Sequence, residues 1–166
     1  SRHDPVTKEI AIKQFHEATN MTDELSSLHS LDIFDRELAN DSIDLFYNKW
    51  KNNPLVLDKW FSLQASRNHK RGLSAIIELT QHKLFEITNP NRVRAVLGSF
   101  SVENTIIFHK EDGTGYEFFI DQILKIDRVN PSVASRLLGV FEVVEKLDDD
   151  RQIKIKSLLK TIINAN

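Results

Sequence analysis

The pentapeptide His16-Glu17-Ala18-Thr19-Asn20 comes nearest to a catalytic metal motif in this sequence. In H-E-x-x-H, two histidines one helical turn apart bind zinc and the glutamate acts as base. Here Asn20 stands where the second histidine is needed, and none of the six histidines has another one three or four positions away. No serine lies in a G-x-S-x-G nucleophile elbow either. We therefore predict no metal ligand and no catalytic residue in this chain.

A second candidate is the glycine pair in "FHKEDGTGYEFF", residues 108–119. Phe118 occupies the position of the third glycine of a dinucleotide fingerprint. A calcium loop that began at Asp112 would need glutamate at its twelfth position, where the sequence has Ile123. We predict a structural turn, in which Gly113 and Gly115 supply backbone freedom before a helix restarts at Tyr116.

Two arginine-bearing stretches, "NPNRVRAVLGSF" and "NPSVASRLLGVF", are less easily explained. Arg92 and Arg94 lie near a predicted helix start, where a positive charge opposes the helix dipole. Ser132 and Arg136 lie within one turn of another start, a position suited to meeting a carboxylate or a carbonyl. The alternative is that the arginines only tie neighbouring helices together, through carbonyls and acids such as Glu103 or Asp121.

The elements that position these residues are predicted to be helices. Each proline follows Asn or Asp, and an Asx N-cap before proline at the first helical position is a strong helix-start signal. The four pairs are Asp4-Pro5, Asn53-Pro54, Asn89-Pro90 and Asn130-Pro131. Asp148-Asp149-Asp150 suits the start of a last helix.

Apolar residues recur with helical spacing between these starts, and no run alternates as a strand would. The predicted core faces are Ile43, Phe46, Tyr47 and Trp50; Leu57, Trp60, Phe61 and Gln64; Val133, Leu137, Val140, Phe141 and Val144; and Ile155, Leu158, Leu159, Ile162 and Ile163. Successive starts lie about 36 to 41 residues apart, close to the length of one HEAT-type helix pair. We predict an all-α fold of antiparallel helix pairs stacked into a short HEAT/ARM-like superhelix, in preference to a four-helix bundle.

Composition narrows the class of protein. The 22 basic and 24 acidic residues are interspersed and give a net charge of −2, so there is no electrostatic footprint for nucleic acid. No apolar run is long enough for a membrane helix, and the first residues lack the apolar stretch of a signal peptide. The absence of cysteine is compatible with a reducing compartment. We expect a cytoplasmic protein with neither a nucleic-acid nor a membrane partner.

Five segments in order, "FHEATNMTDEL", "LVLDKWFSLQA", "NPNRVRAVLGSF", "FHKEDGTGYEFFIDQIL" and "DRVNPSVASRL", closely resemble the C-terminal domain of the bacterial aminopeptidase N family, a branch of the M1 zinc metallopeptidases. The likeness runs from about His16 to Leu159. It implies a helical superhelical domain that packs on an upstream catalytic domain of the same polypeptide. That upstream domain would hold the zinc ion and the catalytic residues.

The resemblance also implies a role in access to the active site. Such a domain encloses the site in a cavity that admits short peptides and unfolded chain ends, and has no catalytic residue of its own. Arg94, Ser132 and Arg136 fall at positions whose relatives face the substrate cavity. Ser132 departs from the glutamine common in relatives, which implies a roomier cavity there.

We expect residues 1–166 to be a single helical domain, an excised C-terminal fragment of a larger aminopeptidase. The sequence does not decide whether Ser1 to His3 derive from a tag. Relatives continue into one further short helix. The alternative, from another class, is a free-standing helical-repeat module whose concave face docks a partner protein.

Overall fold

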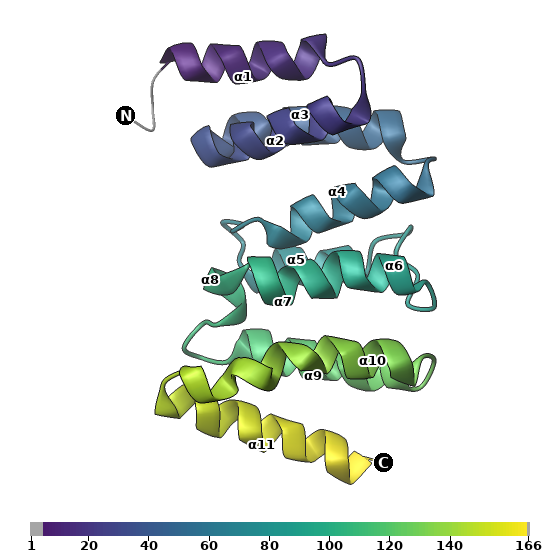
Figure 1. The fold of residues 1–166 in the computed structure, drawn as a ribbon, viewed down its shortest axis with the longest axis vertical. Helices are drawn as coiled ribbons and strands as arrows, with labels where there is room; N and C mark the ends of the chain where they lie inside the picture. The colour runs from purple at the N-terminus through teal and green to yellow at the C-terminus, as the bar shows by residue number, and fades with distance from the viewer. Residues whose placement is uncertain (1–4, 166) are drawn as a thin grey trace. The chain divides into compact units, whose positions relative to one another are not determined.

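The computed structural model describes residues 5–165, and all regular secondary structure among them is helical (Figure 1). The chain divides after Leu63 into two compact units. The first unit contains α1 (Pro5–Glu17), α2 (Met21–Phe34), α3 (Arg36–Trp50) and the first part of α4 (Pro54–Ser66). No helix within the described residues is both long and apolar enough to cross a membrane.

The first unit is a stack of antiparallel helices in which α2 packs against both α1 and α3. Asn20 and Asp35 cap α2 and α3, because their side chains accept bonds from the backbone N–H groups of Asp23 and Leu38. The core side chains of this unit with no more than 1% exposure are Leu28, Leu31, Ala39, Ile43, Phe46 and Phe61. A buried carboxylate, Glu24, joins α2 to α3 by an ion pair with Lys49 and a 2.7 Å hydrogen bond from Trp50 Nε1.

The second unit carries the arginine-bearing stretches. Its elements are α5 (Leu73–Thr80), α6 (Pro90–Val93), the π-helical segment η1 (Arg94–Gly98), α7 (Ser99–Glu103), α8 (Thr105–Phe108), α9 (Thr114–Asp127), α10 (Pro131–Leu138), the 3₁₀ segment η2 (Gly139–Lys146) and α11 (Asp149–Ala165). Helices α9 and α10 form an antiparallel pair, and α11 packs on α9 and η2 (Figure 1). The prediction of an all-α fold of stacked antiparallel helix pairs is confirmed.

The Asx-Pro signals mark real helix starts. Helices α4, α6 and α10 begin at the three internal prolines. The Asn53, Asn89 and Asn130 side chains accept hydrogen bonds from backbone N–H groups of the first turn, at 3.0–3.4 Å. Helix α1 begins at Pro5, whereas Asp4 lies outside the described residues.

The turn between α8 and α9 differs in detail from the prediction. Gly113 adopts a left-handed conformation at φ 72°, as a turn glycine should, but the helix restarts at Thr114 and not at Tyr116. Gly113 is the N-cap residue, and just before it the Asp112 carboxylate accepts bonds from the Thr114 N–H and hydroxyl, a local turn that leads into the helix at Thr114. Gly115 therefore lies within α9. It is needed for close approach, because a Cβ there would lie 2.5 Å from the Phe108 carbonyl oxygen.

An aromatic cluster centred on Phe108 forms the core of the second unit. Its ring lies 5.2–6.1 Å, centroid to centroid, from those of Phe100, Tyr116, Phe119 and Phe141. Most of these pairs meet edge to face, the arrangement that aromatic quadrupoles favour. The cluster joins α7, α8, α9 and η2 and so fixes the body on which the candidate site stands.

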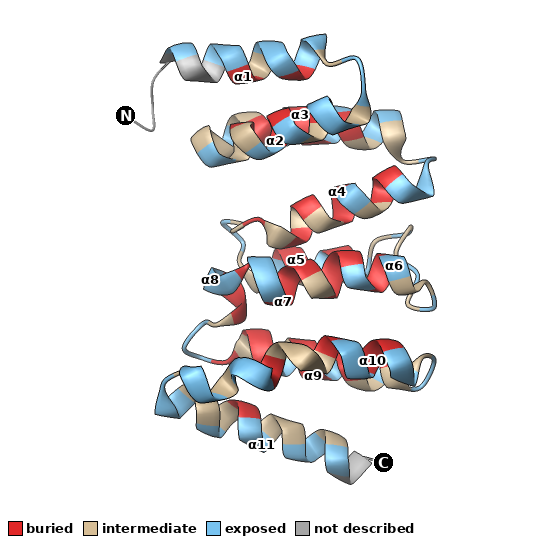
Figure 2. Ribbon diagram, in the orientation of Figure 1, coloured by how far each residue is buried: buried red, intermediate tan, exposed pale blue. Residues whose placement is uncertain are grey.

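The predicted core faces before the last helix are covered only in part. Buried are Ile43, Phe46, Leu57, Trp60, Phe61, Val133, Leu137 and Phe141, whereas Tyr47, Trp50, Gln64, Val140 and Val144 are of intermediate exposure. In α11 Ile155 is buried, Leu158, Leu159 and Ile162 are only partly covered, and Ile163 is 74% exposed. Figure 2 accordingly shows most of α11 as intermediate or exposed. The prediction of Ile163 as a core residue is wrong, because no described helix packs closely enough against the end of α11 to cover it.

Candidate functional site

A pocket of about 320 Å³ in the second unit brings together two of the arginines named from the sequence. Arg94 comes from η1 and Arg136 from α10. The wall between them consists of Gly98 and residues of α7 and α10, principally Val102, Glu103, Val133 and Leu137. The pocket thus has an apolar lining with three charged side chains.

One continuous helical run, residues 90–103, supplies one side of this pocket. Its middle turn, Arg94–Gly98, is a π-helix, a wider turn that is rare and frequent at functional sites. Gly98 stands at the end of this turn opposite Leu137 of α10. The sequence pattern predicted a helix here but gave no sign of the wider turn.

Arg94 and Arg136 are both exposed to solvent. The Arg94 guanidinium donates a 2.7 Å hydrogen bond to the Asn91 side chain, on its own helix. Among residues 5–165, the Arg136 side chain forms neither an ion pair nor a hydrogen bond. Two guanidinium groups therefore reach the pocket without a protein carboxylate bonded to either, an arrangement suited to carboxylate or carbonyl oxygens.

Arg92 behaves differently, although it lies only two residues from Arg94. It is 4% exposed, and its guanidinium donates to the Leu84 carbonyl oxygen. This contact explains why an arginine is favoured against the helix dipole, and it fits the alternative that some of these arginines tie segments together.

Ser132 lies in the first turn of α10 and is exposed, but it is not among the residues that line the pocket. Of the two acids considered as arginine partners, Asp121 instead pairs with Lys125 at 2.6 Å. Glu103 lies in the pocket lining. With two arginines and one glutamate, the pocket lining carries a net charge of +1.

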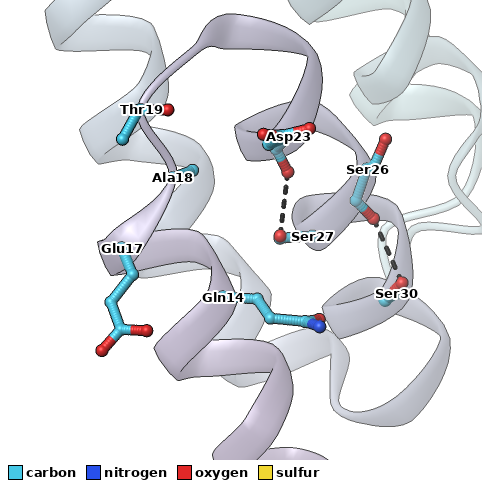
Figure 3. A pocket seen from close by; sticks show the side chains of 8 residues that line it. All are labelled: Gln14, Glu17, Ala18, Thr19, Asp23, Ser26, Ser27 and Ser30. Carbon is cyan, nitrogen blue, oxygen red and sulfur yellow. Dashed lines mark hydrogen bonds between the residues drawn. The ribbon is translucent and has the colours of Figure 1, made fainter.

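A second, polar hollow of about 400 Å³ lies between α1, α2 and their connecting loop (Figure 3). It includes Glu17, from the incomplete metal motif, and Asp23. The hydroxyls of Ser27 and Ser30 donate to backbone carbonyls one turn earlier, at 2.8 and 3.1 Å. None of the eight described residues that line the hollow is a histidine, lysine or arginine that could activate a serine. We find no reason to assign chemistry to it.

The described residues do not fit a zinc site. Within residues 5–165 there is no group of three or more histidine, aspartate or glutamate side chains placed to hold a metal ion. Asn20, at the position of the missing histidine, serves as the N-cap of α2.

A partly buried polar pair beside the aromatic cluster was missed from the sequence. His109 Nδ1 lies 2.7 Å from the Tyr116 hydroxyl, and Arg151 Nε donates a 2.9 Å bond to the His109 carbonyl oxygen. Burial, with a smaller contribution from the Arg151 charge, lowers the pKa of His109. Burial raises the pKa of Tyr116. Seven residues separate the partners across a turn, a spacing that no local motif predicts.

Comparison with known proteins gives a consistent picture. The chain is 38% identical over 150 residues to aminopeptidase N of Escherichia coli. This match covers 90% of this chain and 17% of the relative. Aminopeptidase N of Caulobacter vibrioides is 39% identical over 137 residues, a match that covers 81% of this chain and 16% of the relative. Aminopeptidase N of Haemophilus influenzae is 37% identical over 151 residues, which covers 90% of this chain and 17% of the relative. The chain thus spans about a sixth of the length of these relatives.

Among solved structures, a crystal structure of Legionella pneumophila aminopeptidase A in complex with aspartic acid is similar, with a TM-score of 0.85 and 36% identity. The match covers 93% of this chain and 18% of that one. A family model described as a domain of unknown function with ARM repeats, DUF3458_C, matches residues 1–166. That description confirms the predicted HEAT/ARM-like class, and since the model spans the whole sequence, this chain belongs to the DUF3458_C family of ARM-repeat domains.

Proposed function

We propose that residues 1–166 are the C-terminal helical domain of an M1 zinc aminopeptidase, an enzyme that removes N-terminal amino acids from peptides. In this proposal the zinc ion and the catalytic residues belong to a catalytic domain that precedes this one in the same polypeptide. The helical domain covers the active site, limits entry to short peptides and unfolded chain ends, and contributes no catalytic residue.

The observation that carries the proposal is the identity of 37–39% to aminopeptidase N of three bacteria, over 81–90% of this chain. Because each match takes up only 16–17% of the relative, the remainder of such an enzyme has room for a separate catalytic domain. We also propose that the parent enzyme is cytoplasmic, a location with which the lack of cysteine in this sequence is compatible. We propose neither nucleic acid nor membrane as a partner.

We further propose that Arg94, Ser132 and Arg136 line the substrate cavity. The two guanidinium groups would meet the carbonyl groups or the C-terminal carboxylate of a bound peptide. Their common pocket and their exposure support this role, and so does the lack of a protein carboxylate bonded to either. Ser132, exposed in the first turn of α10, would leave the nearby part of the cavity open.

A mixing experiment tests the proposal. The purified chain is assayed with added zinc on an alanine amide substrate, first alone and then with the separately expressed upstream portion of the same polypeptide. We expect no hydrolysis by the chain alone and hydrolysis after mixing, above the level of the upstream portion by itself. Hydrolysis by the chain alone would contradict the assignment of catalysis to another domain.

The gene sequence upstream of Ser1 separates this function from the alternative of a free-standing binding module. An open reading frame that contains H-E-x-x-H and a downstream glutamate is expected for the aminopeptidase. A start codon immediately before Ser1 would favour the binding module.

A further inference from the structure

The floor of the two-arginine pocket is apolar and has a gap at one position. Val133 and Leu137 of α10 are buried there, whereas Val102 of α7 is 66% exposed at the edge. Gly98 of η1 lines the same pocket, faces Leu137 and contributes no side chain. The space above this floor therefore depends on the lack of a side chain at position 98.

A Cβ atom built on Gly98 shows where that gap points. Its nearest neighbours would be Arg94 Cβ and Leu137 Cδ2, both at 3.9 Å and both belonging to pocket-lining residues. The backbone of Gly98 is helical, at φ −64° and ψ −52°, so conformation does not require glycine here. A side chain at this position would thus project into the pocket without backbone strain.

The charged side chains and the apolar floor of the two-arginine pocket indicate which class of ligand it can bind. Arg94 and Arg136 match a carboxylate, and the apolar floor beside Gly98 matches a small apolar side chain. Glu103 can accept a hydrogen bond from an amide N–H. A carboxylate, an apolar side chain and an amide N–H on adjacent atoms are together the C-terminal residue of a peptide.

We propose that Gly98 is a specificity-determining residue, and that the pocket takes the C-terminal residue of a short peptide when its side chain is small and apolar, such as valine. This inference rests on the proposed function, in which Arg94 and Arg136 face peptide substrates. It adds the class of residue accepted and the position that limits its size.

A binding experiment with N-acetyl amino acids and the 166-residue chain tests the inference directly. Each ligand is titrated into ¹⁵N-labelled protein, and binding is measured from the NMR shift of the Gly98 amide. N-acetyl-L-valine should bind about tenfold more tightly than its uncharged amide, because the amide cannot form charge-assisted bonds to the arginines. It should also bind about threefold to tenfold more tightly than N-acetylglycine, which has no side chain to bury. Equal affinities for N-acetylvaline and N-acetylglycine would overturn the proposal.

Variants at position 98 locate the effect. Gly98→Leu should remove the advantage of N-acetylvaline and leave N-acetylglycine within about twofold of its original affinity, and Gly98→Ala should give an intermediate result. Gly139→Leu is the matched control, because Gly139 is also helical but lies outside the pocket, near the flexible end of Glu142. Equal loss of both ligands in Gly98→Leu, or loss of the valine preference in Gly139→Leu, would contradict the proposal.

This binding experiment needs no peptidase activity, so its failure is distinguishable from that of the proposed function. Restored hydrolysis after mixing, together with no preference for N-acetylvaline, would reject the inference about Gly98 alone. A valine preference without restored hydrolysis would reject the proposed enzyme and retain the pocket.

Discussion

At the scale of single residues, Arg136 offers the sharpest test of a role in substrate binding. In the complete enzyme, Arg136→Ala should lower kcat/KM for a tripeptide about tenfold or more, because a charge-assisted bond to the peptide is lost. Turnover of a single-residue chromogenic amide, which does not reach beyond the first pocket, should fall much less. Arg128→Ala is the control, since Arg128 is exposed and lies outside the pocket. Equal losses on both substrates would contradict the role.

His109 predicts a pH dependence of stability. Its folded-state pKa is lowered, chiefly by burial, so the folded protein binds a proton at His109 less readily than the unfolded chain does. The stabilising contribution of the neutral ring is complete above the unfolded pKa of about 6.5 and decreases as the pH falls below that value. Protonation would also place a cation beside Arg151 and prevent Nδ1 from accepting the Tyr116 hydroxyl hydrogen.

Urea unfolding of the wild-type chain and of His109→Gln at pH 7.5 and 5.5 measures this contribution. The wild-type midpoint should decrease more on acidification than that of the variant. His82, whose pKa is also lowered by burial, is present in both proteins and so cancels from the comparison. The same decrease in both would show that His109 is not the responsible group.

At the scale of elements, two glycines in helical segments should respond in opposite directions to the same substitution. Gly115→Ala should destabilise the chain by about 1–3 kcal/mol, because its Cβ would meet the backbone carbonyls of Ile107 and Phe108 at 2.7 and 2.5 Å. Gly98→Ala should stabilise it by roughly 0.5–1 kcal/mol, because alanine has the higher helix propensity and its Cβ makes only ordinary contacts. Urea unfolding followed by circular dichroism measures both changes.

The same elements show what could be predicted from sequence. Asn–Pro pairs gave the starts of α4, α6 and α10, and apolar spacing gave much of the buried face of α3, α4 and α10, because capping and burial act within a few residues. The π-turn at Arg94–Gly98, the 3₁₀ segment at Gly139–Lys146 and the contact behind Gly115 depend on neighbouring helices, so local patterns do not contain them.

The candidate site was predictable only in part, for the same reason. Arg94 and Arg136 stood out because each lies near a helix start, but the sequence gave no way to separate them from Arg92, which the Leu84 carbonyl oxygen ties down. Gly98 and Glu103 line the pocket because α10, which is distant in the sequence, packs beside η1 in the folded chain. Whether Ser132 shares a cavity with the two arginines stays a prediction.

At the scale of the whole molecule, the loop between α4 and α5, at the start of the second unit, is where we expect early internal cleavage by a protease. The loop that follows α4 contains Lys70 and Arg71, both exposed, and Gly72, whose backbone lies in the left-handed region with open space around it. Exposed loops with such freedom are preferred cleavage sites, whereas helical backbone must first unfold. Trypsin should therefore cut after Lys70 or Arg71 before it cuts within α3 or α9, which contain Lys49 and Lys125.

Mass spectrometry of a brief digest identifies the internal fragments, and those that end at residue 70 or 71 or begin at residue 71 or 72 should appear before any that end at Lys49 or Lys125. The double variant Lys70→Gln and Arg71→Gln removes both sites in this loop and should delay internal cleavage, whereas Lys125→Gln, within α9, should not. Early cleavage inside a helix of either unit would contradict the expected order, because it would mean that local unfolding of that helix costs less than opening the loop between α4 and α5.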